Sequence, residues 1–118
     1  MKTDDVVAAL AALAQSTRLA VFRLLVQQGP TGLAAGEIAA RLDIAPATLS
    51  FHLKELSRAG LVGPRQDGRF IYYAADFAAM NELLGFLTEN CCAADCMSCG
   101  PASSATTRSR KARRKERA

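Results

Sequence analysis

The chain has 118 residues, of which 50% are hydrophobic and 22% are charged, and its formal net charge is +4. This length supports one compact core and excludes two ordinary domains. Residues 108–118 hold seven basic residues and one acidic residue, a local charge of +6, which leaves −2 on residues 1–107. A generally basic folded domain is thereby excluded, so any contact of that part with nucleic acid depends on a few placed basic residues.

The N-terminal residues predict neither export nor membrane insertion. After Met1–Asp5, an Ala- and Leu-rich pattern is interrupted by Gln15, Ser16 and Arg18. This is unlike a signal-peptide h-region or a membrane-spanning segment. We therefore expect a cytoplasmic protein with reduced cysteines and no membrane contact.

Two amphipathic helices are predicted before residue 30, because apolar residues recur at helical spacing. The first extends from Asp4 to Ala14, and the second ends at Gly29-Pro30. A loop at residues 29–32, a short third helix at 35–42 and a turn at 43–45 follow. The apolar positions of the three helices are Val6, Val7, Leu10 and Leu13, then Leu19, Phe22, Leu25 and Val26, then Ile38 and Leu42.

A fourth helix is predicted between Pro46 and Gly60. Proline suits the first helical position, and glycine suits the residue just past a helix end. Leu49, Leu53 and Leu56 form the buried stripe of this helix. Polar residues away from that stripe stay available on the other faces, where the fold has no need of them.

The apolar pattern changes its period after Gly60. Asp67-Gly68 is a strong hairpin signal, so residues 61–74 predict a two-stranded hairpin. Asp76 can cap a last helix that keeps apolar residues at helical spacing as far as Leu87. The expected fold is mainly α, of the α+β type: a winged helix-turn-helix in the order helix, helix, helix, recognition helix, two-stranded wing, helix.

This order predicts a recognition helix in the major groove of DNA and a wing against the backbone or minor groove. Two alternatives stay open: Ser50 can simply cap or bond back to the helix, and His52 can be a satisfied, half-buried histidine. Because one helix and one wing cover a short site, we expect a homodimer on a pseudo-palindromic, double-stranded operator. The candidate contacts are Thr48, Ser50 and His52 to base edges, Lys54 and Arg58 to phosphates, and Arg65, Gln66 and Arg69 beside the wing tip.

All four cysteines of the chain fall in one run just after the last predicted helix. Thiolates are soft donors that select Zn(II), Cu(I), iron–sulfur clusters or trivalent metalloids. Such crowding indicates that the thiols act together as a sensor or carrier site. The candidate ligands are Cys91, Cys92, Cys96 and Cys99.

The chain resembles the ArsR/SmtB family of bacterial metal-responsive repressors over roughly residues 6–90. The resemblance implies a homodimer built on the first and last helices, which binds its operator when empty and releases it when the inducer binds. Gln is frequent in the family where this chain has Pro46, which affects the base contacts expected in that turn. The matching segments are Leu13–Leu19 with Phe22–Leu25, Thr48–Leu56 with Ala59–Val62, and Arg65–Arg69 with Tyr72-Tyr73.

Two inducer sites known in this family have no counterpart here. One uses cysteines at the start of the helix-turn-helix, but residues 36–42 contain none. Another uses His and carboxylates on the last helix, but residues 76–90 contain no His. The resemblance also includes arsenic-responsive members with a vicinal Cys pair and a further Cys after the last helix. We therefore expect As(III), or Sb(III), as inducer on Cys91, Cys92 and a third thiolate from Cys96 or Cys99, with no organic cofactor.

Other uses of the cysteines stay open. Structural Zn(II) would take all four thiolates tetrahedrally, although adjacent ligands strain that geometry. Cys92-x3-Cys96-x2-Cys99 is also an iron–sulfur spacing, and clustered thiols can form a redox switch. The inducer of a DNA-binding protein can equally be Zn(II), Cd(II) or an organoarsenical. A different class of protein, a metallochaperone or small redox protein, would use the thiols without binding DNA.

No enzyme is predicted. His52 has no plausible nucleophile partner, and the sequence has no phosphate-binding glycine loop. The expected organisation is a winged helix-turn-helix DNA-binding and dimerisation domain at residues 1–92, a cysteine-rich inducer-binding segment at 91–99 and a basic, disordered tail at 100–118.

Overall fold

The computed structural model describes residues 1–93. Residues 1–87 form one compact unit, and a second unit begins at Thr88, of which residues 88–93 are described. The predictions for Cys96, Cys99 and the tail at 100–118 therefore lie outside the described residues.

Within residues 1–93, five helices form where the apolar periodicity predicts them. The three predicted helix-end signals are confirmed: Pro46 begins its helix, Gly60 has φ +80° just after it, and Asp76 Oδ1 accepts from the backbone N–H of Ala79 at 2.9 Å. Gln15 supplies a further cap, since its side chain accepts from the N–H of Arg18 at 2.8 Å. The helices are α1 (Thr3–Leu13), α2 (Ser16–Gln28), α3 (Ala35–Leu42), α4 (Pro46–Arg58) and α5 (Phe77–Thr88).

The predicted hairpin is confirmed as β2 (Val62–Asp67) and β3 (Phe70–Ala75). These strands pair antiparallel from Val62↔Ala75 to Asp67↔Phe70, and Gly68 takes φ +64° at the tip. The prediction of two strands was incomplete, however, because β1 (Leu33–Ala34) pairs with the other edge of β3. The sheet therefore has three antiparallel strands in the order β1-β3-β2.

Gly32 permits the close approach of the α2–β1 loop to the wing. Its φ is +75°, and a Cβ at this position would overlap the carbonyl oxygen of Tyr73 and lie 2.9 Å from the carbonyl carbon. Any residue with a side chain would meet both the backbone strain and the steric overlap. Glycine is thus required where β1 joins β3.

One hydrophobic core connects the helices and the base of the sheet. Its fully buried large side chains come from α2, α3, α4 and the segment leading into β2. These elements form the helix-turn-helix and hold its wing, so the core directly sets the positions of both. The largest fully buried side chains are Val21, Leu25, Ile38, Leu49, Leu56 and Leu61.

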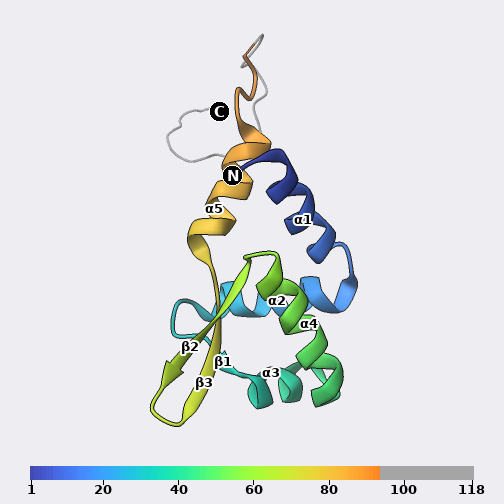
Figure 1. Cartoon of the computed structure of the whole chain (residues 1–118), viewed down its shortest axis with the longest axis vertical. Helices are drawn as coiled ribbons and strands as arrows, with labels where there is room; N and C mark the ends of the chain where they lie inside the picture. The colour runs from blue at the N-terminus through green and yellow to red at the C-terminus, as the bar shows by residue number, and fades with distance from the viewer. Residues whose placement is uncertain (94–118) are drawn as a thin grey trace, which may run out of the picture. The chain divides into compact units, whose positions relative to one another are not determined.

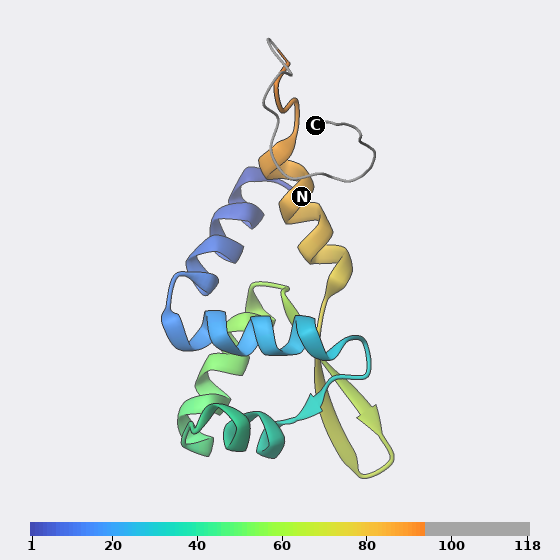
Figure 2. The same cartoon turned by 180° about the vertical axis from the view of Figure 1, so that it is seen from behind.

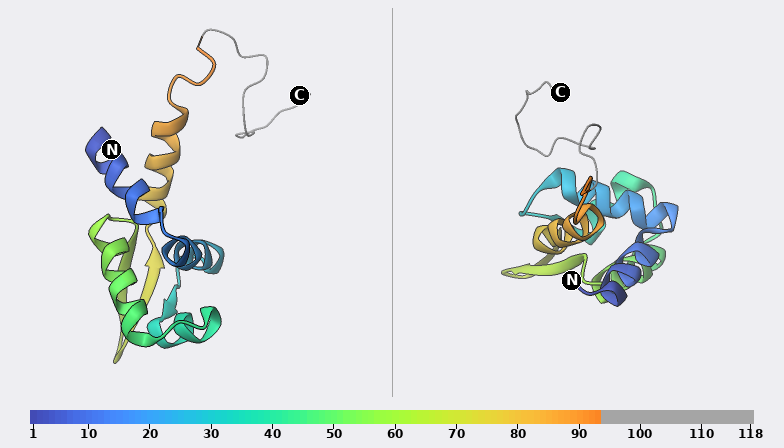
Figure 3. Two further views of the ribbon diagram at one scale, coloured as in Figure 1. Left: turned by 90° about the vertical axis from the view of Figure 1, so that its right-hand side faces the viewer. Right: turned by 90° about the horizontal axis from the view of Figure 1, so that it is seen from above.

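Within residues 1–87 the elements separate into two ends. Figure 1 shows α3, the N-terminal half of α4 and the hairpin tip at one end, and α1 and α5 at the other. The reverse view in Figure 2 and the side view in Figure 3 show the same separation, with α2 lying between the two ends. The predicted recognition helix and wing therefore face the same side of the unit.

Within residues 1–93, no single helix is both long and apolar enough to cross a membrane. Helices α1 and α2 reach such a length and composition only together, and the chain bends by 102° between them.

Candidate DNA-binding surface and thiol turn

The exposed face of α4 is a continuous surface of small, polar and aromatic side chains. Ala47, Ser50, Phe51 and Lys54 are exposed and follow one another at helical spacing, with Thr48 exposed beside them. The three predicted contacts Thr48, Ser50 and Lys54 therefore share a solvent-facing surface on the N-terminal two thirds of the helix. We call these five residues the α4 surface.

Two members of the α4 surface were not predicted from the sequence, Ala47 and the much larger Phe51. Its side chain is 55% exposed, although it is a large hydrophobic residue. The signal was available, because Phe51 does not follow the spacing of the predicted buried stripe of Leu49, Leu53 and Leu56.

His52 lies between this surface and the buried stripe of α4, because it is four residues after Thr48 and four before Leu56. Its side chain is only 8% exposed, and its Nδ1 lies 3.4 Å from Nη1 of Arg18. Because a guanidinium can only donate, Nδ1 accepts, which places the proton of a neutral ring on Nε2. The burial of His52 and its contact with Arg18 agree with the interpretation of a satisfied histidine. They do not agree with the other expectation, that His52 contacts base edges.

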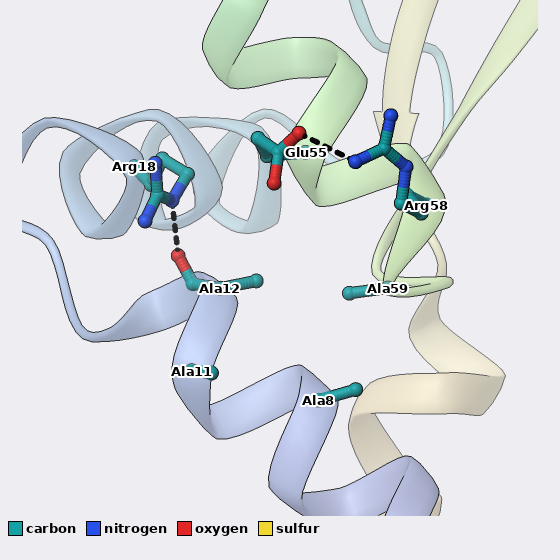
Figure 4. A pocket seen from close by; sticks show the side chains of 7 residues that line it. All are labelled: Ala8, Ala11, Ala12, Arg18, Glu55, Arg58 and Ala59. Atoms are coloured by element: carbon teal, nitrogen blue, oxygen red, sulfur yellow. Dashed lines mark hydrogen bonds and ion pairs between the residues drawn. The ribbon is translucent and has the colours of Figure 1, made fainter.

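Arg18 joins three helices around that histidine. Its Nε donates to the carbonyl oxygen of Ala12 at the end of α1 at 2.6 Å, as Figure 4 shows, while Nη1 reaches His52 on α4. Hydrogen bonds to a charged donor are stronger than neutral ones. Arg18 is thus a structural link between α1, α2 and the recognition helix.

Arg58 occupies a different environment from the other predicted phosphate contacts. It lies ten residues beyond Thr48, about 15 Å along the helix axis. Figure 4 shows it near the C-terminal end of α4, where it lines a pocket with Ala59 and, across the pocket, Ala8 of α1. Its Nη1 lies 2.9 Å from Oε2 of Glu55, and the side chain remains 65% exposed. The structure therefore places Arg58 away from the end of the unit that carries the wing tip.

The three predicted wing residues differ in what they contact. Arg65 donates two hydrogen bonds to the carbonyl oxygen of Thr31, at 3.1 and 2.7 Å, and its guanidinium lies 4.9 Å from the centre of the Tyr72 ring. Gln66 donates to the carbonyl oxygen of Gly68 at 3.3 Å, across the hairpin tip. Arg69 is exposed beside that tip. Arg65 therefore fixes the wing, while Arg69 is exposed beside its tip, and its predicted contact with DNA stays a prediction.

The two described cysteines lie in a turn that follows α5 directly. The N–H of Cys91 donates to the carbonyl oxygen of Thr88 at 2.8 Å, and Asn90 and Cys92 have φ of +59° and +60°. The two Sγ atoms are 3.5 Å apart, well beyond the roughly 2.05 Å of a disulfide. We call residues 88–93 the thiol turn.

A complete metal site is not present in the described part of the chain. Within residues 1–93, no three His, Cys, Asp or Glu side chains come together in an arrangement that could hold a metal ion. Cys91 and Cys92 therefore supply two donors, and any third thiolate must come from Cys96 or Cys99, outside the described residues.

Apolar side chains are also exposed on the two helices at the other end of the unit. On α1 these are Val7 and Leu10, and on α5 they are Leu84 and Leu87, the last two 52% and 56% exposed. An open groove of about 440 Å³ runs between α2 and α5, with Leu19, Met80 and Leu84 among its lining residues. These side chains and the groove are candidates for a surface that a second protein copy would cover.

The helix-turn-helix segment of this chain is similar to that of known proteins. A family model described as a helix-turn-helix domain matches residues 13–64. The nodulation protein NolR of Rhizobium meliloti is 32% identical over 80 residues, which cover 68% of this chain and 63% of NolR. The transcriptional activator HlyU of Vibrio cholerae is 35% identical over 78 residues, 64% of this chain and 69% of HlyU.

Solved structures are similar to this chain over 67–74% of its length. An ArsR-like transcriptional regulator from Rhodococcus sp. RHA1 is 29% identical, with a TM-score of 0.63 over 71% of this chain and 76% of that one. A homodimeric winged helix-turn-helix domain from Mycobacterium bovis, a possible ArsR-family regulator, is 31% identical, with a TM-score of 0.58 over 74% and 81%. A possible transcriptional regulator for arsenical resistance is 34% identical, with a TM-score of 0.56 over 67% and 79%.

The relatives from Vibrio cholerae and Rhodococcus are named as transcriptional regulators, and the matching helix-turn-helix model covers α3 and α4 of this chain. The exposed α4 surface and the wing beside it provide the elements that such a regulator places on DNA. The chain is a DNA-binding transcriptional regulator that belongs to the ArsR/SmtB family.

Proposed function

We propose that this protein is a repressor that binds its operator as a homodimer and releases it when trivalent arsenic, or antimony, bonds Cys91, Cys92 and either Cys96 or Cys99. The observation that carries the proposal is the thiol turn, where two adjacent Sγ atoms lie 3.5 Å apart. Both thiols follow the last helix without any intervening domain. A soft ion bound there would act directly at the end of α5.

The spacing of the two sulfur atoms allows both to bond one ion. Their separation of 3.5 Å is within the reach of two bonds of about 2.3 Å to a shared atom. The choice of a pyramidal over a tetrahedral centre rests on the adjacency of Cys91 and Cys92, which strains tetrahedral zinc geometry. Trivalent arsenic bonds three thiolates and keeps a lone pair on its fourth side, which compresses its bond angles below the tetrahedral value.

The backbone of the thiol turn supports capture of an ion from solution. Cys91 is exposed, and the left-handed conformations at Asn90 and Cys92 end the helix, so the pair is not held in helical geometry. Cys96 and Cys99 follow within seven residues of Cys92, a length over which the chain can turn back to deliver a third thiolate.

The proposed dimer uses the exposed apolar side chains of α1 and α5. Covering Val7, Leu10, Leu84 and Leu87 with a second copy would remove them from water, at about 25 cal/mol per Å² of apolar surface. The Mycobacterium bovis relative is homodimeric, which supports this arrangement. A two-fold dimer would present two copies of α4 to the two halves of a pseudo-palindrome.

The proposed coupling follows from continuity of the chain. The thiol turn begins at the last residue of α5, and Leu84 and Leu87 lie in the last turn and a half of the same helix. Drawing three sulfurs onto one atom would constrain the end of that helix and change how it packs in the dimer. The spacing of the two α4 helices would then no longer match successive major grooves. The relative from an arsenical resistance system supports this choice of inducer.

The test is release of DNA across a panel of ions. The probe is a duplex selected from a randomised pool by the protein without metal, and release is followed by fluorescence anisotropy with arsenite, antimonite, Zn(II) and Cd(II). Arsenite and antimonite are expected to release the duplex. Release by Zn(II) or Cd(II) alone would contradict the proposal and favour a tetrahedral thiolate site.

Single Cys→Ser variants identify the ligands. Cys91→Ser and Cys92→Ser are expected to bind the duplex as the wild type does and to lose the arsenite response. Either Cys96→Ser or Cys99→Ser is expected to lose the response, and the other variant is expected to keep it. The variant that keeps the response is the matched control for the loss of a thiol. If Cys91→Ser or Cys92→Ser stops binding DNA without arsenite, the cysteines are structural and the proposal is wrong.

A further inference from the structure

We propose that Phe51 is a sequence-specifying residue of the recognition helix, which contacts the C5-methyl group of a thymine in the major groove. The proposal rests on the DNA-binding role of α4 and adds to it the base that this side chain would select. It also assigns a role to the one large hydrophobic side chain among the exposed residues of α4.

The exposure of Phe51 has no structural explanation within the described fold. The core is formed by residues at other positions of α4, among them Leu49, Leu53 and Leu56, and is complete without Phe51. The remaining exposed apolar side chains of the helices lie on α1, α2 and α5, so Phe51 does not extend the proposed dimer surface. Because Phe51 is 55% exposed, another molecule that covers its ring would gain from removing apolar surface from water.

The neighbours of Phe51 indicate which molecule that is. Ala47 lies one turn before it, Lys54 lies about one turn after it, and Ser50 lies beside it, all exposed. These residues occupy the N-terminal part of α4, the part of a recognition helix that contacts base edges. In such a position Lys54 can neutralise a phosphate at the edge of the major groove, while Phe51 and Ala47 face the base edges on the floor of the groove.

The Phe51 ring is held in place before it meets DNA. Its centroid lies 5.5 Å from that of the His52 ring, with 63° between the ring planes, an edge-to-face contact. His52 is in turn buried and held by Nη1 of Arg18, whose Nε donates to Ala12. A side chain whose orientation is already fixed loses less conformational entropy on binding. The Arg18–His52 contact thus gives the phenyl ring a defined orientation.

The chemistry of the major groove selects thymine. Guanine, adenine and cytosine present hydrogen-bonding groups there that a phenyl ring cannot satisfy, whereas thymine also presents a methyl group. Contact of Phe or Ala with that methyl is a known form of base recognition. Because residues 1–107 carry a net charge of −2, phosphate contacts are few, and such apolar contacts take a larger share of the binding energy.

The experiment replaces single thymines by deoxyuridine, which removes only the methyl group. The probe is the duplex that the wild-type protein selects from a randomised pool without arsenite. Each half-site is expected to contain one thymine whose replacement, made alone, weakens wild-type binding about fourfold. This fold-change corresponds to the loss of one methylene-sized contact of about 0.8 kcal/mol. Equal wild-type affinity for every deoxyuridine duplex would overturn the proposal.

Two substitutions and a control assign the effect to Phe51. Phe51→Ala is expected to bind thymine and deoxyuridine duplexes equally, while Phe51→Leu keeps an apolar side chain and is expected to retain at least a twofold preference. Phe70→Ala makes the same change at an exposed Phe of the wing and is expected to keep the full fourfold preference. A fourfold preference retained by Phe51→Ala would overturn the proposal.

The outcome is separate from that of the proposed inducer. If arsenite releases the wild-type protein but no thymine methyl matters, the assignment of Phe51 is wrong and the inducer proposal stands. If a thymine methyl matters but arsenite does not release the duplex, the assignment of Phe51 stands and the inducer proposal is wrong.

Discussion

The DNA-facing end of the unit and the thiol turn are held in place by different forces. α4 and the base of the wing are anchored by core residues such as Leu49, Leu56 and Val62, and by side-chain links such as Arg65 to Thr31. The thiol turn is held by local backbone hydrogen bonds, from Cys91 to Thr88 and from Ala93 to Asn90. Substitutions at the first should therefore change stability, and substitutions at the second should change the response to an ion.

This difference is consistent with the proposed function, in which one region binds DNA and the other binds an ion. Base contacts require side chains positioned to within a fraction of an ångström, which packed elements provide. An ion shifts the proposed regulator between two states only by its difference in affinity for them. The predictions below test the contrast, in order of decreasing effect on the free energy of unfolding.

Gly32→Ala is expected to have the largest effect. It combines φ +75° with overlap onto the Tyr73 carbonyl, and we expect a loss of about 2–5 kcal/mol in chemical denaturation. Gly36→Ala is the control, since Gly36 lies in α3 with open space around its Cβ position, and it should be neutral or stabilising by up to about 1 kcal/mol. Equal effects of the two substitutions would mean that the α2–β1 loop does not constrain the wing.

Arg18→Ala is expected to destabilise the protein by about 1–3 kcal/mol, because it leaves the Ala12 carbonyl and the buried His52 without their charged donor. Arg23→Ala removes an exposed arginine from the same helix and should change stability by less than about 0.5 kcal/mol. Thermal unfolding of both variants provides the comparison. Similar melting temperatures would show that Arg18 is not a structural link.

Asp76→Ala is expected to cost about 1 kcal/mol, since it removes the side-chain cap of α5 from the Ala79 N–H. Asp76→Asn keeps the oxygen acceptor and should recover most of that loss. Urea denaturation midpoints of the two variants and the wild type test this order. A loss as large for Asn as for Ala would assign the effect to charge rather than to capping.

Cys91→Ser and Cys92→Ser are expected to have the smallest effect on stability, within about 0.5 kcal/mol, because the thiol turn is exposed or half-buried and contributes nothing to the described core. The same variants should lose the arsenite response entirely. A destabilisation of 2 kcal/mol or more would mean that the thiols are part of the fold and would remove the contrast between the two regions.

The helices and the hairpin could be predicted because their signals are local. Apolar spacing marked each buried face, and Pro46, Gly60, Asp76 and Asp67-Gly68 marked ends and turns that the structure confirms within one or two residues. Strand β1 could not be predicted in the same way. Two residues show no period, and their pairing partners Tyr72 and Tyr73 lie about forty residues away in the sequence.

The DNA-binding surface could be predicted as a region but not residue by residue. Thr48, Ser50 and Lys54 are exposed as expected, whereas His52 is buried. His52 lies three residues after Leu49 and four before Leu56, so it shares their face, and helical spacing was sufficient to predict its burial. The Arg65–Thr31 and Arg18–His52 contacts are tertiary, and no local pattern in the sequence indicates them.

The central claim is that arsenite and operator DNA bind to opposing states of one protein, and reciprocal linkage tests it most directly. Arsenite affinity is measured by isothermal titration with and without a saturating amount of the selected duplex. Coupling of about 1–3 kcal/mol predicts arsenite binding about 5–150-fold weaker in the presence of the duplex, with an equal weakening of duplex binding by arsenite. Equal arsenite affinities in the two titrations would contradict the claim.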